Sequence, residues 1–142
     1  MKKILFVCTG NTCRSPMAMA LFNRKASEKG LDMQAVSAGL YADGSPLSEN
    51  ARRALEIRGI TGIKHNSVQL DAMLLDECDY IFGISARHAS CIEAQYPGAK
   101  GKVFPFPADI PDPFGQELDV YLCTLEEIEK GVDAIISAVS EE

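Results

Sequence analysis

The sequence lacks several features that would assign it to other classes of protein. It contains no tryptophan and only two histidines, and none of its five cysteines stands in a Cys-x2-Cys pair. The scarcity of histidine and of closely paired cysteines argues against a zinc site. An odd number of cysteines fits no disulfide framework of a small secreted protein. We therefore expect free thiols, no metal and no other cofactor.

Long apolar runs and an excess of basic residues are also missing. No apolar run reaches the ~18 residues that a membrane-spanning helix needs, and the run at 3–7 is too short for a signal peptide. The 14 basic residues are outnumbered by 20 acidic ones, which gives a net charge of −6. Because nucleic acids attract basic surfaces, this charge argues against a nucleic-acid partner. We expect a cytoplasmic monomer that contacts neither membrane nor nucleic acid.

The apolar residues alternate between strand and helix patterns. Strands are predicted at 3–7, 33–37, 80–84 and 102–104, and helices at 17–29, 47–58, 70–77, 87–95 and 118–139. Ser48 is the expected N-cap of the second helix. The alternation predicts an α/β fold in a single domain, residues 1–142, with a four-stranded parallel sheet and helices on both faces. Ligands of such folds bind beyond the carboxyl ends of the strands.

The first predicted strand ends in the segment CTGNTCRSP, residues 8–16. Pro16 suits the first turn of a helix, whose N–H groups and dipole favour an anion. The same field favours the thiolate of Cys8, a nucleophile, and Arg14 offers a planar guanidinium to two phosphate oxygens. Gly10 allows backbone angles closed to other residues, and Asn11 tolerates left-handed geometry better than most residues do. The segment thus predicts a phosphate-binding loop that carries its own nucleophile.

A cysteine and an arginine at this spacing also occur by chance. A free cysteine after a strand is commonly a small buried hydrophobe. The glycine, the asparagine and the Ser-Pro pair between strand and helix favour the phosphate-binding interpretation. Ser15 is then placed to donate a hydrogen bond to the sulfur of Cys8, which eases departure of that sulfur as a leaving group.

The motif VCTGNTCRSPMA resembles the low-molecular-weight protein tyrosine phosphatase family, and the likeness extends over nearly the whole chain. Weaker matches are Val36-Ser37-Ala38-Gly39 and His65, and a specific one is Asp112-Pro113-Phe114-Gly115. The resemblance implies that Cys8 and Arg14 are catalytic within a phosphate-binding loop formed by Thr9, Gly10, Asn11, Thr12, Cys13 and Ser15. It implies that Asn11 shapes the loop and that His65 hydrogen-bonds to Asn11 from behind. A turn histidine without a role is the alternative for His65.

The segment 105–115 contains four prolines, which make a stiff loop suited to presenting one side chain. Asp109 and Asp112 are the candidate acids there. The resemblance implies Asp112, because it stands in an Asp-Pro pair, and leaves Asp109 as a turn residue. Asp112 would protonate the leaving group and then take a proton from the water that hydrolyses a phosphocysteine. The loop N–H groups and Arg14 would hold the phosphoryl oxygens, without a metal.

The substrate depends on the residue two positions before the arginine. Tyrosine phosphatases of this family commonly carry isoleucine there, whereas Thr12 resembles the protein arginine phosphatase branch. An isoleucine would leave the donors of a phosphoarginine guanidinium unpaired, at about 1–3 kcal/mol per group. Leu40, Tyr41 and Phe114 are the further expected pocket-wall residues, in a region where many tyrosine-specific members place tryptophan or tyrosine. Phosphoarginine in a protein substrate is the favoured interpretation, and phosphotyrosine is the alternative.

Other classes of function remain as weaker alternatives. Arsenate reductases of this fold relay a disulfide through two further, closely spaced cysteines, whereas Cys78 and Cys91 are far apart in the sequence. A non-catalytic phosphate-binding or redox module would have lost the nucleophile, the arginine or the acid. We also expect Cys13 to act as a redox partner, attacking an oxidised Cys8 to form a reversible disulfide. The alternative is that Cys13 only packs.

Overall fold

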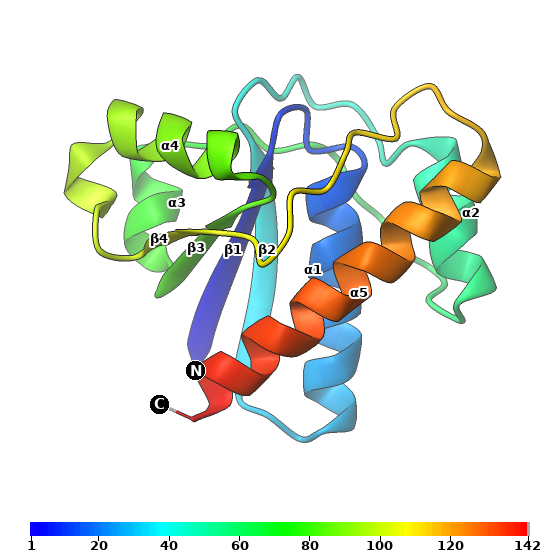
Figure 1. Cartoon of the computed structure of the whole chain (residues 1–142), viewed down its shortest axis with the longest axis horizontal. Coiled ribbons are helices and arrows are strands. Elements are labelled where there is room, and N and C mark those ends of the chain that lie inside the picture. Colours follow the sequence, from blue (N-terminus) through cyan, green and yellow to red (C-terminus); the bar gives the residue numbers. More distant parts are fainter. Residues whose placement is uncertain (142) are drawn as a thin grey trace.

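The computed structural model describes residues 1–141 of the chain. Four parallel strands form one sheet in the order β2-β1-β3-β4. Their bounds are β1 Lys2–Cys8, β2 Met33–Gly39, β3 Tyr80–Gly83 and β4 Val103–Pro105. Parallel pairing brings the carboxyl ends of all four strands to one edge of the sheet (Figure 1), as the alternating pattern predicts.

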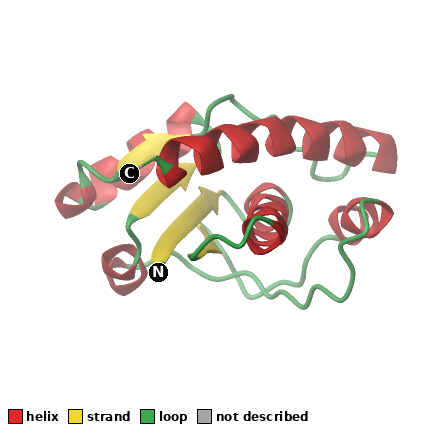
Figure 2. Cartoon of the chain, turned by 90° about the horizontal axis from the view of Figure 1, so that it is seen from below, coloured by secondary structure: helices red, strands yellow, loops and turns green. Residues whose placement is uncertain are grey.

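Helices cover both faces of this sheet (Figure 2). The helices of the described residues are α1 Arg14–Glu28, α2 Glu49–Ile57, α3 Ala72–Glu77, α4 Ala86–Gln95 and α5 Leu118–Ser140, with a short 3-10 helix at Pro97–Ala99. The fold class predicted from the sequence is therefore confirmed. Helix α1 begins at Arg14 rather than at residue 17, because the Cys13 carbonyl already accepts a hydrogen bond from Met17 N–H at 3.1 Å.

Alternate residues of β1 face opposite layers of the core. Ile4 and Phe6 pack with residues of α1 and α5, whereas Leu5 and Val7 pack with residues of α3 and α4. All four side chains are buried, as expected for a parallel strand that is covered on both faces. This central strand therefore holds Cys8, the residue at its carboxyl end, on a rigid base.

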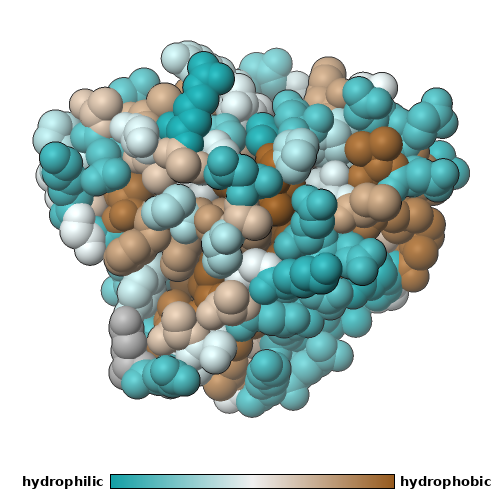
Figure 3. Space-filling view, in the orientation of Figure 1, coloured by the Kyte–Doolittle hydropathy of each residue, from teal (hydrophilic) through white to brown (hydrophobic). Residues whose placement is uncertain are grey.

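Helix α5 lies across α1 (Figure 1), and its apolar stripe belongs to the same buried cluster as residues of α1. Leu125, Ile128 and Val132 are fully buried on that side. Hydrophilic side chains follow the outer face of the same helix (Figure 3). Such a one-sided pattern is typical of a surface helix of a globular protein. Among the described helices, none combines the length and the apolar character needed to cross a bilayer.

Candidate active site

The loop between β1 and α1 directs its carbonyl groups toward the surrounding protein. The carbonyls of Cys8 and Thr9 accept hydrogen bonds from the N–H groups that follow β2, at 3.0 and 2.9 Å. The Thr12 carbonyl accepts one from the backbone N–H that precedes α2, at 3.0 Å. Within the described chain, the N–H groups of residues 9–13 donate to no protein group. The loop therefore offers unpaired backbone donors, which suit an anion.

The special backbone angle of this loop belongs to Asn11. Asn11 has φ +58° and is completely buried, whereas Gly10 lies outside the left-handed region. Of the two neighbours expected to permit such an angle, Asn11 is the one that adopts it. Asparagine is among the few non-glycine residues that tolerate this region, because its short polar side chain can bond locally. Here Nδ2 donates to the nearby Ser15 Oγ at 2.8 Å, and Oδ1 accepts from the N–H of Val68, in a distant segment, at 2.9 Å.

A directed chain of hydrogen bonds ends at the sulfur of Cys8. Ser15 Oγ accepts from Asn11 Nδ2, so its own proton is available to Cys8 Sγ, which lies 2.9 Å away. The Ala38 carbonyl is a more distant acceptor at 3.4 Å. All of these groups are buried, and the Cys8 residue is 3 % exposed. Ser15 is thus positioned as a donor to sulfur, the arrangement expected from the sequence.

Two residues support the loop from below and behind. His65 Nε2 lies 2.8 Å from the Asn11 carbonyl oxygen, which is the expected contact. Gly39, at the end of β2, lies directly under the loop. A Cβ atom on Gly39 would lie 2.7 Å from the Thr9 carbonyl oxygen, so this close approach requires glycine.

Arg14 connects the predicted phosphate-binding loop to the proline-rich loop, residues 105–115. Its Nη1 donates to the Ile110 carbonyl at 3.0 Å, and its Nη2 lies 3.6 Å from Asp112 Oδ2. The Arg14 side chain is 9 % exposed, whereas that of Asp112 is 53 % exposed. The acid therefore faces solvent at the entrance while the arginine lies inside. Phe114 N–H donates to Asp112 Oδ1 at 3.1 Å and helps to hold the carboxylate in place.

Asp109 has a different position from Asp112. Its Oδ1 accepts a hydrogen bond from Ala86 N–H, the first residue of α4, at 2.9 Å. Asp109 therefore ties the proline-rich loop to the start of a helix, where a carboxylate is favoured by the helix dipole. It does not line either of the cavities described below.

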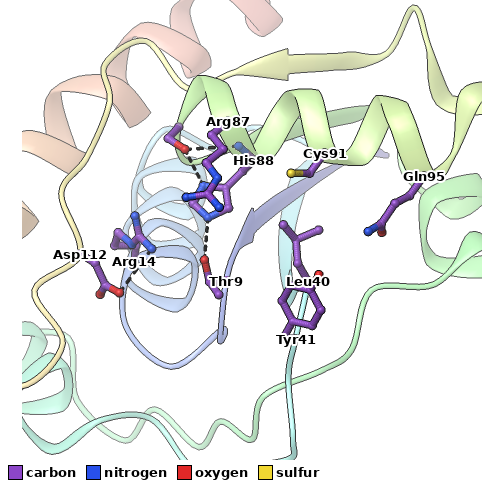
Figure 4. Close-up of a pocket in the computed structure, with 10 residues that line it drawn as sticks. Thr9, Arg14, Leu40, Tyr41, Arg87, His88, Cys91, Gln95 and Asp112 are labelled. Atoms are coloured by element: carbon purple, nitrogen blue, oxygen red, sulfur yellow. Dashed lines mark hydrogen bonds and ion pairs between the residues drawn. The ribbon is translucent and has the colours of Figure 1, made fainter.

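Two adjoining cavities open at the loop, and the predicted wall residues are divided between them. The smaller, of about 190 Å³, is lined by residues 8–14 with Asp112 and Phe114. The larger, of about 430 Å³, shares Thr9, Arg14 and Asp112 and is bordered by Leu40, Tyr41 and side chains of α4 (Figure 4). Thr12 thus lies beside the nucleophile and the acid, whereas Leu40 and Tyr41 lie beside the neighbouring cavity.

His88 is a site residue that the sequence reasoning missed. Its Nε2 lies 2.9 Å from Thr9 Oγ1 and its Nδ1 lies 2.7 Å from Ser85 Oγ. Burial, together with the cationic Arg14 and Arg87, lowers the pKa of His88 to about 4, against smaller opposing effects of the nearby acids Asp112 and Asp109. The imidazole is therefore neutral near pH 7. The available signal was its place just after the third predicted strand, at the sheet edge that carries the loop.

The other thiols occupy different environments. Cys13 Sγ contacts the hydroxyls of Ser48, at 3.2 Å, and Tyr121, at 3.4 Å. Ser48 holds the N-cap position of α2 but makes no capping hydrogen bond through its side chain. Burial raises the pKa of Cys78 to about 11, so that thiol is a poor nucleophile. All five cysteines are free.

Comparison with known proteins identifies the class to which this fold and loop belong. The family described as low molecular weight phosphotyrosine protein phosphatase matches residues 3–142. The chain belongs to this family, as the resemblance of its motifs predicts.

Individual relatives include enzymes named for two different substrates. A protein-arginine-phosphatase of Geobacillus stearothermophilus is 36% identical, with 99% of this chain and 97% of the relative covered. A probable low molecular weight protein-tyrosine-phosphatase of Ralstonia nicotianae is 33% identical, with 97% and 96% covered. A solved YwlE arginine phosphatase, whose active-site cysteine is replaced by a phosphorylated serine, superposes with a TM-score of 0.93. That structure is 33% identical, with 99% of this chain and 97% of that chain covered.

Proposed function

We propose that this protein hydrolyses phosphoarginine residues of proteins through a phosphocysteine intermediate on Cys8. The main observation that supports phosphatase chemistry is the geometry of the loop between β1 and α1. It places a sulfur 2.9 Å from the Ser15 hydroxyl, under unpaired backbone N–H groups and beside a buried guanidinium. These are the groups that nucleophilic phosphoryl transfer needs: a nucleophile, donors for the phosphoryl oxygens and a donor to the sulfur.

The reaction then follows in two steps. The Cys8 thiolate attacks phosphorus while the loop N–H groups and Arg14 hold the three equatorial oxygens. The bond from phosphorus to the leaving nitrogen breaks, and that nitrogen takes a proton from Asp112. Water then attacks the phosphocysteine and gives its proton back to Asp112. The hydrogen bond from Ser15 stabilises the Cys8 thiolate as it leaves and free phosphate is released.

The assignment to arginine rests on Thr12 and on the relatives. Thr12 lines the 190 Å³ cavity together with Cys8 and Asp112, so a polar hydroxyl stands near the position of the leaving group. A guanidinium carries several N–H donors, and a hydroxyl and a carboxylate are acceptors for them. Relatives named protein-arginine-phosphatase, from Geobacillus stearothermophilus and Bacillus subtilis, match over most of the chain at 36% identity. Together these observations favour phosphoarginine.

Phosphotyrosine is the second candidate, because a specific feature favours it. Tyr41 and Phe114 are large aromatic side chains that are 74% and 67% exposed at the two cavities. Aromatic walls suit a phenyl ring. Relatives named tyrosine phosphatases also match nearly the full chain.

Matched peptides separate the two candidates. We would measure kcat/KM of the wild-type protein on a phosphoarginine peptide and on a phosphotyrosine peptide of otherwise identical sequence, with Cys8→Ser as the blank. A large preference for phosphoarginine supports the proposal. A preference for phosphotyrosine would contradict the proposal and place the chain among the tyrosine-specific members of the family.

The cellular location, oligomeric state and partners of the enzyme are part of the same proposal. We place it in the cytoplasm as a monomer that acts on protein substrates and binds neither nucleic acid nor membranes. The net charge of −6 and the free cysteines support this setting.

A further inference from the structure

The larger cavity extends well beyond the groups that the proposed chemistry uses. It begins at Thr9 and Arg14 and runs along α4 past Arg87 to Gln95, with a volume of about 430 Å³ (Figure 4). The phosphoryl group is expected in the smaller cavity, which contains Cys8. The larger cavity is therefore open to another part of the same substrate.

The Thr9 hydroxyl lies at the end of a chain of hydrogen bonds that passes through His88. Ser85 Oγ accepts from the backbone N–H of His88 at 3.3 Å and lies 2.7 Å from Nδ1 of that histidine, to which it can donate its own proton. In the tautomer whose Nδ1 accepts, the neutral imidazole carries its proton on Nε2 and donates it to Thr9 Oγ1 at 2.9 Å. Within the described residues, the proton of the Thr9 hydroxyl then has no acceptor. An anion in the cavity favours this tautomer, because the Thr9 hydroxyl can then donate to it.

Arg87 adds a cation to the same cavity. Its side chain is exposed, and among residues 1–141 it has no ion pair or hydrogen bond. Figure 4 shows it extending from α4 beside the His88 ring. The guanidinium therefore stands unneutralised at the edge of the phosphate-binding loop.

Among the described residues, neither Asp109 nor Asp112 forms an ion pair with Arg87. Asp112 lies 3.6 Å from Arg14, and Asp109 accepts the Ala86 N–H at 2.9 Å. The cavity consequently presents an unpaired guanidinium and a hydroxyl that can donate. A carboxylate, which accepts hydrogen bonds and carries one negative charge, matches both.

We propose that this cavity is a subsite for the carboxylate of an aspartate or glutamate next to the phosphorylated residue in the protein substrate. Arg87 pairs with the carboxylate and the Thr9 hydroxyl donates to it. This inference rests on the proposed function, since it assumes a phosphorylated protein as the substrate. It also explains how a chain with a net charge of −6 accepts an acidic segment at this one place.

Paired peptides test the subsite. Two phosphoarginine peptides would carry glutamate in one and glutamine in the other at the position before the phosphorylated residue, and a second pair would vary the position after it. We expect wild-type kcat/KM to favour glutamate about fivefold in at least one pair, the effect of one exposed ion pair. The gain should arise mainly in KM and decrease with added salt.

Matched variants assign the effect to the cavity. Arg87→Gln should bring the ratio close to one, and Thr9→Val should reduce it. Arg53→Gln removes one positive charge from an exposed arginine on α2 that lines neither cavity, so it should keep the wild-type ratio. A wild-type ratio of one in both pairs, or a ratio that survives Arg87→Gln, overturns the subsite and leaves the proposed function standing. Failure to hydrolyse any of the four peptides overturns the proposed function and the subsite with it.

Discussion

Arg14 Nη2 lies 3.6 Å from Asp112 Oδ2, although Arg14 begins helix α1 and Asp112 lies far along the sequence in the loop before α5. The parallel sheet accounts for this proximity, because β1 and the short strand β4 both end at the same edge. The contact places the proposed general acid next to Arg14, the group proposed to hold the phosphoryl oxygens. A bound phosphoryl group would then lie between the nucleophile and the acid, as in-line transfer requires.

Asp112→Asn tests the role of the acid. We expect kcat on a phosphoarginine peptide to fall roughly 10²- to 10⁴-fold, the usual contribution of general acid–base catalysis, with a much smaller change in KM. Asp109→Asn is the matched control, because Asp109 instead bonds to the start of α4. Steady-state kinetics of both variants would measure these changes in kcat and KM. Equal losses in the two variants would mean that loop structure, rather than proton transfer, accounts for the effect.

Thr12→Ile tests the origin of specificity. The change replaces a hydroxyl in the 190 Å³ cavity by an apolar group. We expect the ratio of kcat/KM for phosphoarginine over phosphotyrosine peptides to fall at least about tenfold, since an unpaired polar group costs about 1–3 kcal/mol. Thr12→Ser keeps the hydroxyl and should keep most of the ratio. An unchanged ratio in Thr12→Ile would make Thr12 a packing residue.

Cys13→Ser tests the proposed redox partner. Peroxide converts the Cys8 thiolate to a sulfenic acid, and the Cys13 thiol then displaces water to form a disulfide. Both residues line the same cavity, but Cys13 must leave its contacts with Ser48 and Tyr121. We expect a dithiol to restore peroxide-treated wild type but not Cys13→Ser.

The control for this experiment is Cys91→Ser, because Cys91 is a free thiol that lines the neighbouring cavity. It should recover as the wild type does. Irreversible inactivation of wild type and Cys13→Ser to the same extent would rule out the disulfide.

Because His88 is buried and neutral, we predict that the stability of the protein depends on pH. Its pKa is lowered from 6.5 to about 4, chiefly by burial and also by Arg14 and Arg87, while Asp112 and Asp109 act in the opposite direction. Between pH 6.5 and about pH 4, His88 is protonated in the unfolded chain but stays neutral in the folded chain. The free energy of unfolding should therefore decrease over this window, by about 3 kcal/mol at most.

Denaturant unfolding at several pH values measures this effect. His88→Gln lacks the titrating ring, so its stability relative to wild type should improve as the pH falls from 6.5 toward 4. A difference between the two proteins that stays constant over this window would contradict a neutral, buried His88.

The sequence predicted the parts of this molecule that depend on local patterns. The apolar run of β1, the proline in the first turn of α1 and the stripe of α5 specify those elements directly. The loop around Cys8 was recognisable because its chemistry needs particular residue types at fixed spacing. The left-handed angle falls on Asn11 rather than Gly10, and residue type alone does not tell which of two permissive neighbours adopts it.

Contacts between distant segments were harder to predict. The bond from His88 to Thr9 joins residues on α4 and on the first loop, and no spacing in the sequence encodes it. The hydroxyl of Ser48 contacts Cys13 rather than capping its helix, because the neighbouring loop supplies a partner. Such contacts depend on how helices pack against the sheet, which local periodicity does not determine.

The most direct test of the account is to look for phosphate on Cys8. Wild-type protein would be mixed with a phosphoarginine peptide, quenched in acid within the first turnover, digested and analysed by mass spectrometry. The account predicts a phosphoryl group on the peptide that contains Cys8, and none when Cys8→Ala is used. Hydrolysis of the phosphoarginine peptide without any phosphorylated Cys8, or a phosphorylated Cys8 formed only from a phosphotyrosine peptide, would contradict it.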